Sequence, residues 1–217
     1  MKITNSTSYN LTSFKATKVA TTQNFLRGVT TEIELYKLGR EDKRFLQEWL
    51  KKVDFKKLCP NLSETLQKRW QKVFNYCISQ AEDFDHTSYV AVSENKPCGI
   101  LTFVEDATYF LDGICAVPNE LGKKANLVGK TLFYQVFKDA NKDDAKGIDL
   151  KAINDGPFDV VEKYEKLGFK REHCPTDEYT KMHCNKHKIA TQLHELPFEI
   201  DYIEAEPEKV NLNYFLD

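Results

Sequence analysis

Hydrophobic and polar residues follow changing periods along the chain, and these periods predict the order of strands and helices. Residues Glu32–Leu38 alternate, which predicts a half-buried strand. Two stretches with helical spacing follow, one opening near Arg40 and one capped by Asn61 or Ser63 and ending near Ala81. The apolar stripes expected to face a core are Phe45, Leu46, Trp49, Leu50 and Val53 in the first helix and Leu66, Trp70, Val73, Cys77 and Ala81 in the second.

Three closely spaced strands come next, at Ser88–Val92, Gly99–Val104 and Tyr109–Val117, and their short turns predict antiparallel pairing. A helix begins near Leu127. The strand Ile148–Ile153 follows that helix, so it should return parallel to Tyr109–Val117 by a right-handed crossover. The helix is expected to bury Leu132, Phe133, Val136, Phe137 and Ala140 and to turn Lys130, Gln135 and Lys138 to water.

The last third of the chain predicts smaller elements. A second helix carries Tyr164, and Lys170–His173 pairs with Glu178–His183 as a hairpin. A polar helical piece over Lys186–Leu193 precedes an acidic tail. Alternation over residues 198–202 fits either an edge strand or a segment packed on the body, and the pattern does not choose between them.

These elements predict a single α/β domain with a mixed, mostly antiparallel sheet flanked by helices. The domain is expected over residues 30–184. Residues 1–29 are rich in Ser, Thr and Asn and carry no acidic side chain, so a flexible or surface-docked arm is expected there. Residues 185–217 form an acidic C-terminal extension.

Composition narrows the class of protein. Of the 217 residues, 41% are hydrophobic and 29% are charged, as in an ordinary soluble globular protein. A net charge of -2 gives no electrostatic reason to expect nucleic acid or an anionic membrane as partner. No apolar run is long enough to span a bilayer, and no secretory signal opens the chain. Six scattered cysteines indicate reduced thiols, so a cytoplasmic location is expected.

The stretch Tyr109–Phe169 holds the most specific signal. It ends in Tyr164-Glu165-Lys166-Leu167-Gly168-Phe169, which resembles the Tyr-x-x-x-Gly-Phe of the GCN5-related N-acetyltransferase (GNAT) family. The predicted element order is similar to that family's over roughly Thr30 to Cys184. The resemblance implies the acyl-CoA N-acyltransferase fold and acetyl-CoA as co-substrate. It also implies direct acetyl transfer to a primary amine, without a covalent enzyme intermediate.

The resemblance also implies where acetyl-CoA binds. The strands Tyr109–Val117 and Ile148–Ile153 would splay into a V-shaped gap, and the pantetheine amides would pair with the freed backbone. The pyrophosphate would rest on the N-terminus of the next helix. The family's Arg/Gln-x-x-Gly-x-Gly/Ala motif aligns best with Lys124–Gly129, where Lys124 and Leu127 depart from it. The implied cofactor-binding residues are Ala116, Val117, Lys124, Asn126, Leu127, Val128, Gly129, Lys130 and Asn154.

Acetyl transfer needs a base for the amine, a donor for the oxyanion and an acid for the departing thiolate. The resemblance assigns the acid to Tyr164, although the same side chain could simply pack with its helical neighbours. Asp112 and Glu105 are both candidates for the base. A backbone amide near Val117 is the expected oxyanion donor. Asn154 either binds pantetheine or shapes the turn that follows its strand.

Two other kinds of site are disfavoured. Gly129-Lys130-Thr131 resembles the end of a P-loop, but six residues separate Gly122 from Gly129, whereas a P-loop has about four between its glycines. His173-Cys174 and His183-Cys184 face each other across the predicted hairpin. Neighbouring side chains in a strand point to opposite faces, so at most two of the four converge and no metal site is expected.

The sequence does not identify the acceptor, which could be a small-molecule amine or a protein amino group. It also leaves open whether the protein is a monomer or a homodimer. A non-catalytic acyl-CoA-binding or protein-interaction domain on the same fold is the second reading. The departures at Lys124 and Leu127 favour it.

Overall fold

The computed structural model describes residues 15–26, 29–117, 125–154, 159–172, 178–195 and 200–216. The described residues form one nine-stranded sheet in the order β7-β8-β6-β5-β4-β3-β2-β1-β9. Each pairing among these strands is antiparallel except β5 with β6, which is parallel. The strands are β1 (Ala16–Leu26), β2 (Val29–Lys37), β3 (Thr87–Ser93), β4 (Lys96–Val104), β5 (Tyr109–Ala116), β6 (Gly147–Ile153), β7 (Lys170–Arg171), β8 (Tyr179–Asn185) and β9 (Ile200–Val210).

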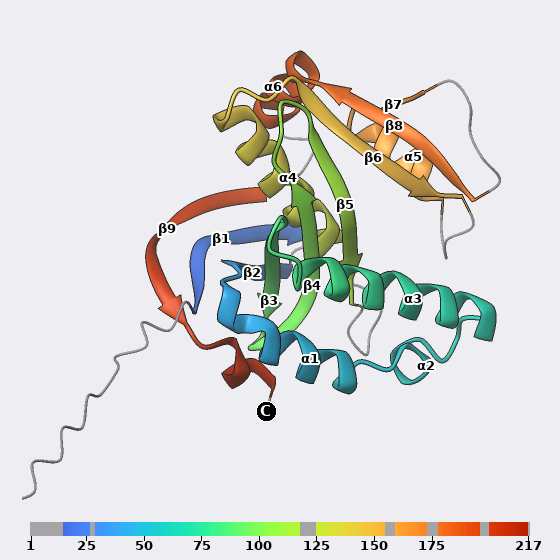
Figure 1. The fold of residues 1–217 in the computed structure, drawn as a ribbon, viewed down its shortest axis with the longest axis vertical. Helices are drawn as coiled ribbons and strands as arrows, with labels where there is room; N and C mark the ends of the chain where they lie inside the picture. Colours follow the sequence, from blue (N-terminus) through green and yellow to red (C-terminus); the bar gives the residue numbers. More distant parts are fainter. Residues whose placement is uncertain are drawn as a thin grey trace, which may run out of the picture.

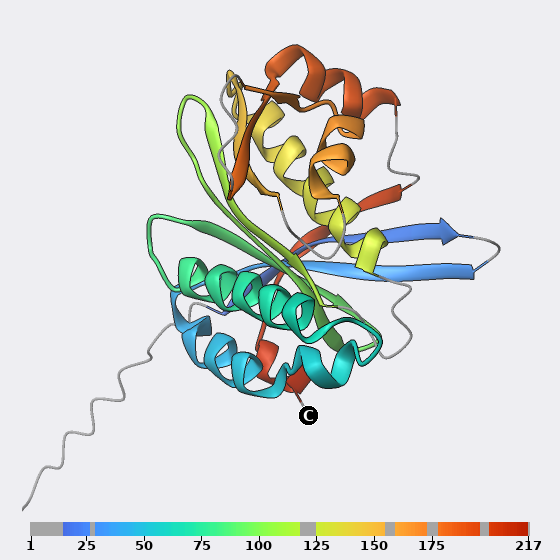
Figure 2. The ribbon, with the colours of Figure 1, turned by 90° about the vertical axis from the view of Figure 1, so that its right-hand side faces the viewer.

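Helices cover the two faces of this sheet unequally (Figures 1 and 2). The helices and turns are η1 (Arg40–Asp42), α1 (Lys43–Lys52), α2 (Phe55–Leu58), α3 (Glu64–Ala81), α4 (Ala125–Lys142), α5 (Val160–Lys166), α6 (Lys186–Glu195) and η2 (Leu212–Leu216). One core cluster joins α1, α2, α3 and η2 to one face, and a second joins α4, α5 and α6 to the other. The predicted fold class is therefore confirmed: a mixed, mostly antiparallel sheet flanked by helices.

Local sequence explains the two helices on the first face. Ser63 caps α3, and its hydroxyl accepts a hydrogen bond from the Leu66 amide at 3.4 Å. In α1 the predicted residues Phe45, Leu46 and Trp49 are buried. In α3 the stripe lies elsewhere than predicted. Only Cys77 of the predicted set is fully buried, because α3 lies between the sheet and α1–α2 and so buries parts of two faces. The other buried residues of α3 are Gln67, Phe74 and Ile78.

Helix α4 buries all five residues predicted for its stripe. One prediction for its outer face is wrong. Gln135 is buried, because β9 crosses over α4 and the Tyr202 hydroxyl donates a hydrogen bond to Gln135 Oε1 at 2.7 Å. The distant strand β9 is invisible in the local period of α4, so the pattern assigned Gln135 to water.

Both chain ends join the sheet. From Ala16 onward the expected N-terminal arm is strand β1, paired with β2 on one side and with β9 on the other. Within the alternation over residues 198–202, Ile200 and Tyr202 belong to edge strand β9, so the described part of this segment is an edge strand; residues 198 and 199 lie outside the described residues. After β9, Leu212 is fully buried beneath α1, and Lys52 donates a hydrogen bond to the Leu216 carbonyl. The described part of the acidic extension thus packs against the body of the protein.

Two composition-based expectations can be compared with the described residues. Cys59, Cys77, Cys98, Cys115 and Cys184 are free thiols. Within the described ranges, the helices are all too short or too polar to cross a lipid bilayer.

Candidate active site

Strands β5 and β6 part after a short shared ladder. They pair only at Tyr109↔Ile148, Phe110↔Asp149 and Leu111↔Leu150, although β5 continues to Ala116 and β6 to Ile153. Figure 1 shows the two strands diverging from this end. The expected V-shaped gap is therefore present, with its vertex at Leu111.

The inner edge of β5 presents backbone groups to this gap. The Val117 amide donates to the Cys98 carbonyl at 2.8 Å, so it points toward β4. Successive peptide groups in a strand point to opposite sides, which turns Ile114 and Ala116 toward the gap. The Ala116 carbonyl accepts from the Trp70 indole N–H at 3.1 Å. Ala116, and not Val117, is therefore the amide near the expected position that faces the gap.

A β-bulge places Asp112 at the vertex. Thr102 pairs with Gly113 and Phe103 pairs with Leu111, which leaves Asp112 as the extra residue of β5. Bulges re-aim side chains, and they are frequent beside active sites. The bulge turns Asp112 toward α3, where Tyr76 Oη donates to Asp112 Oδ1 at 2.7 Å.

The Asp112 carboxylate has a second partner, which the sequence did not suggest. His86 Nε2 lies 3.0 Å from Asp112 Oδ2, and the His86 side chain is only 9% exposed. Burial raises the pKa of Tyr76 to about 12, and the hydrogen bond to Asp112 and the charge of that carboxylate add to the shift. The Tyr76 phenol therefore remains a hydrogen-bond donor at neutral pH.

Gly113 explains why α3 can approach the bulge so closely. A Cβ added at Gly113 would lie 2.8 Å from Cys77 Sγ and 2.9 Å from Thr102 Oγ1. Only glycine avoids this clash with the α3 residue that packs on β5. The sequence contains no spacing signal for the contacts of Asp112, since His86, Tyr76 and the bulge meet only in the folded sheet.

Tyr164 stands on α5, on the β6 side of the gap. Its ring is half-buried, with ring centroids 5.1 Å from Phe133 and 6.2 Å from Phe169. Burial raises its pKa, and the Cys77 and Cys115 thiols add to the shift. No described residue forms a hydrogen bond with the Tyr164 hydroxyl. The phenol is therefore neutral, and its proton is available to a ligand.

The rest of the Tyr-x-x-x-Gly-Phe motif has a structural explanation. The Phe169 amide donates to the Tyr164 carbonyl at 3.0 Å and the Gly168 amide donates to the Glu165 carbonyl at 2.9 Å, which is a Schellman ending. Gly168 has φ +94, and a Cβ there would lie 2.6 Å from Lys188 Cγ. Phe169 is buried against Phe133. Only Tyr164 has a polar group that the fold leaves unused.

The start of α4 lies at the wide end of the gap. Lys124 and Pro118 fall outside the described residues, as does the side chain of Asn126, whose backbone belongs to the first turn of α4. Leu127 and Val128 are buried in the core, so the Leu127 side chain does not cover the outside of this turn.

Gly129 and Lys130 form the accessible part of this helix start. A Cβ added at Gly129 would meet no heavy atom within 4 Å, so the backbone there is open to approach. Lys130 beside it is half-buried. An open backbone followed by a cation, near a helix N-terminus, suits an anionic group.

Glu105 and Asn154 already have partners. Glu105 is exposed at the turn before β5, accepts from Thr87 Oγ1 at 2.6 Å and lies 3.9 Å from Lys37 Nζ. Asn154 Oδ1 accepts from Thr180 Oγ1 at 2.6 Å, which ties the end of β6 to β8. Their predicted roles as base and pantetheine ligand stay predictions.

The hairpin with the His and Cys pairs is only partly described, since His173 and Cys174 lie outside the described residues. His183 Nδ1 lies 2.6 Å from Asp149 Oδ1, whereas Cys184 is fully buried on the other face of the sheet. Among the described residues no group of three metal-ligating side chains occurs.

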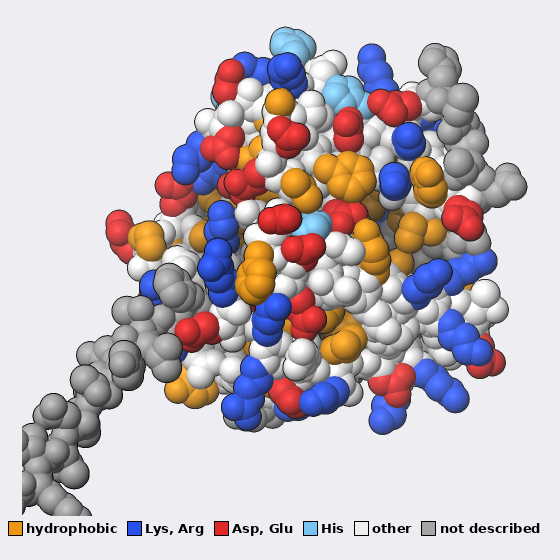
Figure 3. Space-filling model, in the orientation of Figure 1, with side chains coloured by type: hydrophobic (Ala, Val, Ile, Leu, Met, Phe, Trp, Pro, Cys, Tyr) orange, Lys and Arg blue, Asp and Glu red, His pale blue; other side chains and the backbone are white. Residues whose placement is uncertain are grey.

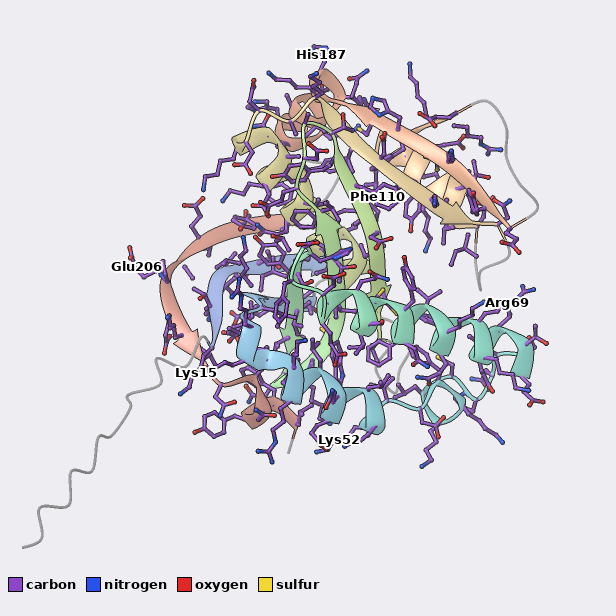
Figure 4. All side chains as sticks on the ribbon, in the orientation of Figure 1. Lys15, Lys52, Arg69, Phe110, His187 and Glu206 are labelled. Carbon is purple, nitrogen blue, oxygen red and sulfur yellow. The ribbon has the colours of Figure 1, made fainter. Side chains whose placement is uncertain are left out.

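The gap is flanked on its α3 side by an uncovered sheet face. Residues of β6 and β8 alternate between the core under α4–α6 and solvent. On the solvent side Lys151 Nζ lies 5.8 Å from the Phe110 ring centroid and 5.2 Å from that of Tyr179. Figure 3 shows hydrophobic side chains gathered between α3 and β6, and Figure 4 places Phe110 where β5 and β6 part.

No family model and no curated protein sequence matches this chain. Solved structures do resemble it. An uncharacterised protein from Bacillus halodurans is 14% identical at a TM-score of 0.50, covering 81% of this chain and 95% of its own. PaiA N-acetyltransferase from Thermoplasma acidophilum, in complex with coenzyme A, is 21% identical at 0.49, covering 70% and 98%. Tetrahymena GCN5 is 18% identical at 0.45, covering 67% and 88%. The Bacillus halodurans likeness shows a shared fold.

Proposed function

We propose that this protein is an N-acetyltransferase of the GNAT type that transfers the acetyl group of acetyl-CoA directly to a primary amine. The observation that carries the proposal is the gap between β5 and β6, which end their ladder at Leu111 and Leu150. The gap has a carboxylate at its vertex and an unpaired phenol beside it. The motif that ends in Phe169 and the order of the elements support the same class.

The gap offers what a pantetheine chain needs. Backbone groups of Ile114 and Ala116 face it, and a ligand that imitates a strand can pair with them at little cost. The open backbone at Gly129 and the ammonium of Lys130 suit the pyrophosphate at the start of α4. Acetyl-CoA would therefore run from the wide end of the gap toward its vertex.

The proposed chemistry uses three groups. Asp112 takes a proton from the acceptor ammonium, directly or through one water, and the freed amine attacks the thioester carbonyl. The Ala116 amide stabilises the oxyanion of the tetrahedral intermediate. When the carbon–sulfur bond breaks, Tyr164 donates its proton to the departing thiolate, and the phenolate regains a proton from solvent. The products are the acetylated amine and coenzyme A.

The acceptor would enter from the α3 side. That face of β6 and β8 is uncovered, and it leads to Asp112 across Phe110. The two carboxylates Asp83 and Asp112 flank His86 there, so a cationic amine would be attracted.

The test is acetyl-CoA-dependent thiol release over a panel of amines, from polyamines and amino acids to peptides with a free amino group. Tyr164→Phe should lose most of the turnover, because phenylalanine cannot donate the proton. Tyr214→Phe is the matched control, since that side chain is 74% exposed on η2, far from the gap. Full turnover by Tyr164→Phe would remove the acid role.

Calorimetric titration with acetyl-CoA distinguishes the proposed enzyme from a non-catalytic domain on the same fold. Binding without turnover on any amine would favour a non-catalytic acyl-CoA-binding domain. No binding at high micromolar ligand would favour an interaction domain.

A further inference from the structure

His86 is the only described histidine that contacts Asp112. Its Nε2 lies 3.0 Å from Asp112 Oδ2, while Tyr76 occupies Oδ1 at 2.7 Å. A carboxylate held by one donor on each oxygen has a fixed orientation, and its remaining lone pairs point in fixed directions. An ionised Asp112 accepts hydrogen bonds only, so the Nε2 atom of a neutral His86 must carry the proton.

The other ring nitrogen is unusual. His86 Nδ1 is buried and has no hydrogen-bond partner among the described residues, and the same is true of Ser88 Oγ. Ser88 follows two residues later, in strand β3. Buried polar atoms that lack a partner call for a specific explanation.

Two carboxylates and helix α3 surround the His86–Asp112 pair. The charged and titratable groups around His86 are Asp112 on β5 and Asp83 in its own loop, whose Oδ2 lies 3.9 Å from Nδ1. Tyr76 and Cys77 of α3 face the other side of Asp112.

We propose that His86 and Tyr76 are positioning residues for Asp112, and that their two hydrogen bonds hold the carboxylate in the orientation in which it takes the proton from the acceptor amine. This inference rests on the proposed acetyl transfer. With a neutral ring, the Nε2–H and Tyr76 O–H bonds orient the carboxylate and leave it a competent base.

The proton balance in this scheme is simple. The N–H bond of the acceptor ammonium breaks and an O–H bond forms on Asp112, while the Nε2–H and Tyr76 O–H bonds stay intact. Asp112 then releases its proton to solvent after the acetyl group has moved. His86 carries no proton between substrate and solvent, so it acts only through Asp112.

The first test needs no acceptor. Nitrogen-15 NMR of the full chain distinguishes the two neutral tautomers, and loss of signals in His86→Gln assigns the ring. The expected result is the Nε2–H tautomer in the wild type, with the preference lost in Asp112→Ala and kept in Asp83→Asn. An Nδ1–H tautomer in the wild type, or an unchanged one in Asp112→Ala, would overturn the inference. An unchanged amide spectrum away from the site verifies the fold of each variant.

The second test compares two replacements of His86 in the thiol-release assay. His86→Gln keeps an N–H donor but cannot titrate, and His86→Leu has no donor. His86→Leu should lose about 10- to 100-fold in kcat/KM through misorientation of Asp112. His86→Gln should retain most activity, because its side-chain amide can still donate to Asp112. Equal losses in both variants would show a merely structural role.

The two levels of the proposal fail in different ways. If the wild type acetylates no amine in the panel, the proposed function fails, while the tautomer result still decides whether Asp112 and His86 are coupled. If acetylation occurs but the tautomer is wrong, only the inference about His86 fails.

Discussion

The V-shaped gap has two arms, which differ in how completely helices cover them. The first arm is β5 with its neighbours β4 and β3, and the second arm is β6 with its neighbour β8. In β3 and β4 successive residues are buried on both faces, because α1–α3 pack on one side and α4 on the other. In β6 and β8 burial alternates, because α4–α6 cover only one face. The first arm is therefore a rigid support for Asp112. The second arm leaves an open face beside the gap, through which an acceptor can reach the vertex.

The difference is visible in side-chain chemistry. Ile100 and Leu101 are neighbours in β4, and both are fully buried, in different core clusters. Leu150 and Lys151 are neighbours in β6, where one is buried and the other exposed. A strand covered on both faces reads as a continuous apolar run, and a strand covered on one face alternates.

The largest expected effect is on catalysis, where each side of the gap is proposed to contribute one proton-transfer group. Replacing Tyr164, on the α5 side, by Phe should lower kcat by about 10²- to 10⁴-fold, the usual contribution of a positioned acid. Replacing Asp112, at the vertex, by Asn should lower kcat by a similar factor. Thiol-release kinetics with saturating acetyl-CoA measure both. If only one of the two variants loses activity, then only that residue takes part in proton transfer.

The second prediction compares how much free energy of unfolding is lost when neighbouring side chains of β4 and of β6 are replaced by alanine. Ile100→Ala and Leu101→Ala should each cost about 2–5 kcal/mol of unfolding free energy, because both positions are fully buried. In β6, Leu150→Ala should cost about as much, whereas Lys151→Ala should stay within about 0.5 kcal/mol. Urea unfolding followed by circular dichroism measures all four variants. A large cost for Lys151→Ala would mean that the second face is covered too.

The third prediction compares two glycines at α4: Gly99 of β4, on which the helix packs, and Gly129 of the helix itself. At Gly99 an added Cβ would lie 2.3 Å from Val128 Cγ1, so Gly99→Ala should cost about 1–3 kcal/mol by overpacking. At Gly129 an added Cβ meets nothing within 4 Å, so Gly129→Ala should gain up to about 1 kcal/mol of stability. Thermal unfolding measures both changes.

Gly129→Ala also separates an effect on stability from an effect on acetyl-CoA binding. Gly129→Ala places a methyl group where the pyrophosphate is proposed to approach, so its affinity for acetyl-CoA should fall although its stability rises. Calorimetric titration measures this. Unchanged affinity would place the pyrophosphate elsewhere.

The smallest expected effect is on the open face itself. Ile153 is 41% exposed on β6, so Ile153→Ser should change stability by no more than about 0.5 kcal/mol. If the acceptor crosses this face, the variant should raise the KM for the amine and leave kcat unchanged, as expected when binding is lost equally in ground and transition states. An unchanged KM would direct the acceptor to another approach.

Much of the fold could be predicted because local patterns carried it. The helical period predicted α1, α3 and α4, and the short turns predicted the β3–β4–β5 meander. Strand β1 was harder to predict. It lies in a polar segment with no clear alternation, and it is held by pairing with β2, its neighbour in sequence, on one side and with β9, which is distant in sequence, on the other. Such pairing comes from the partner strands, so composition alone suggested an arm.

For the site, the sequence by itself determined the motif around Tyr164, the element order and the list of possible carboxylates. Only the tertiary structure decided that β5 and β6 part at Leu111, that Ala116 and not Val117 faces the gap, and that Asp112 meets Tyr76 and His86. The physical reason is that a β-bulge and a strand register are properties of paired strands. A sequence states which residues follow one another, and the ladder decides which of them meet.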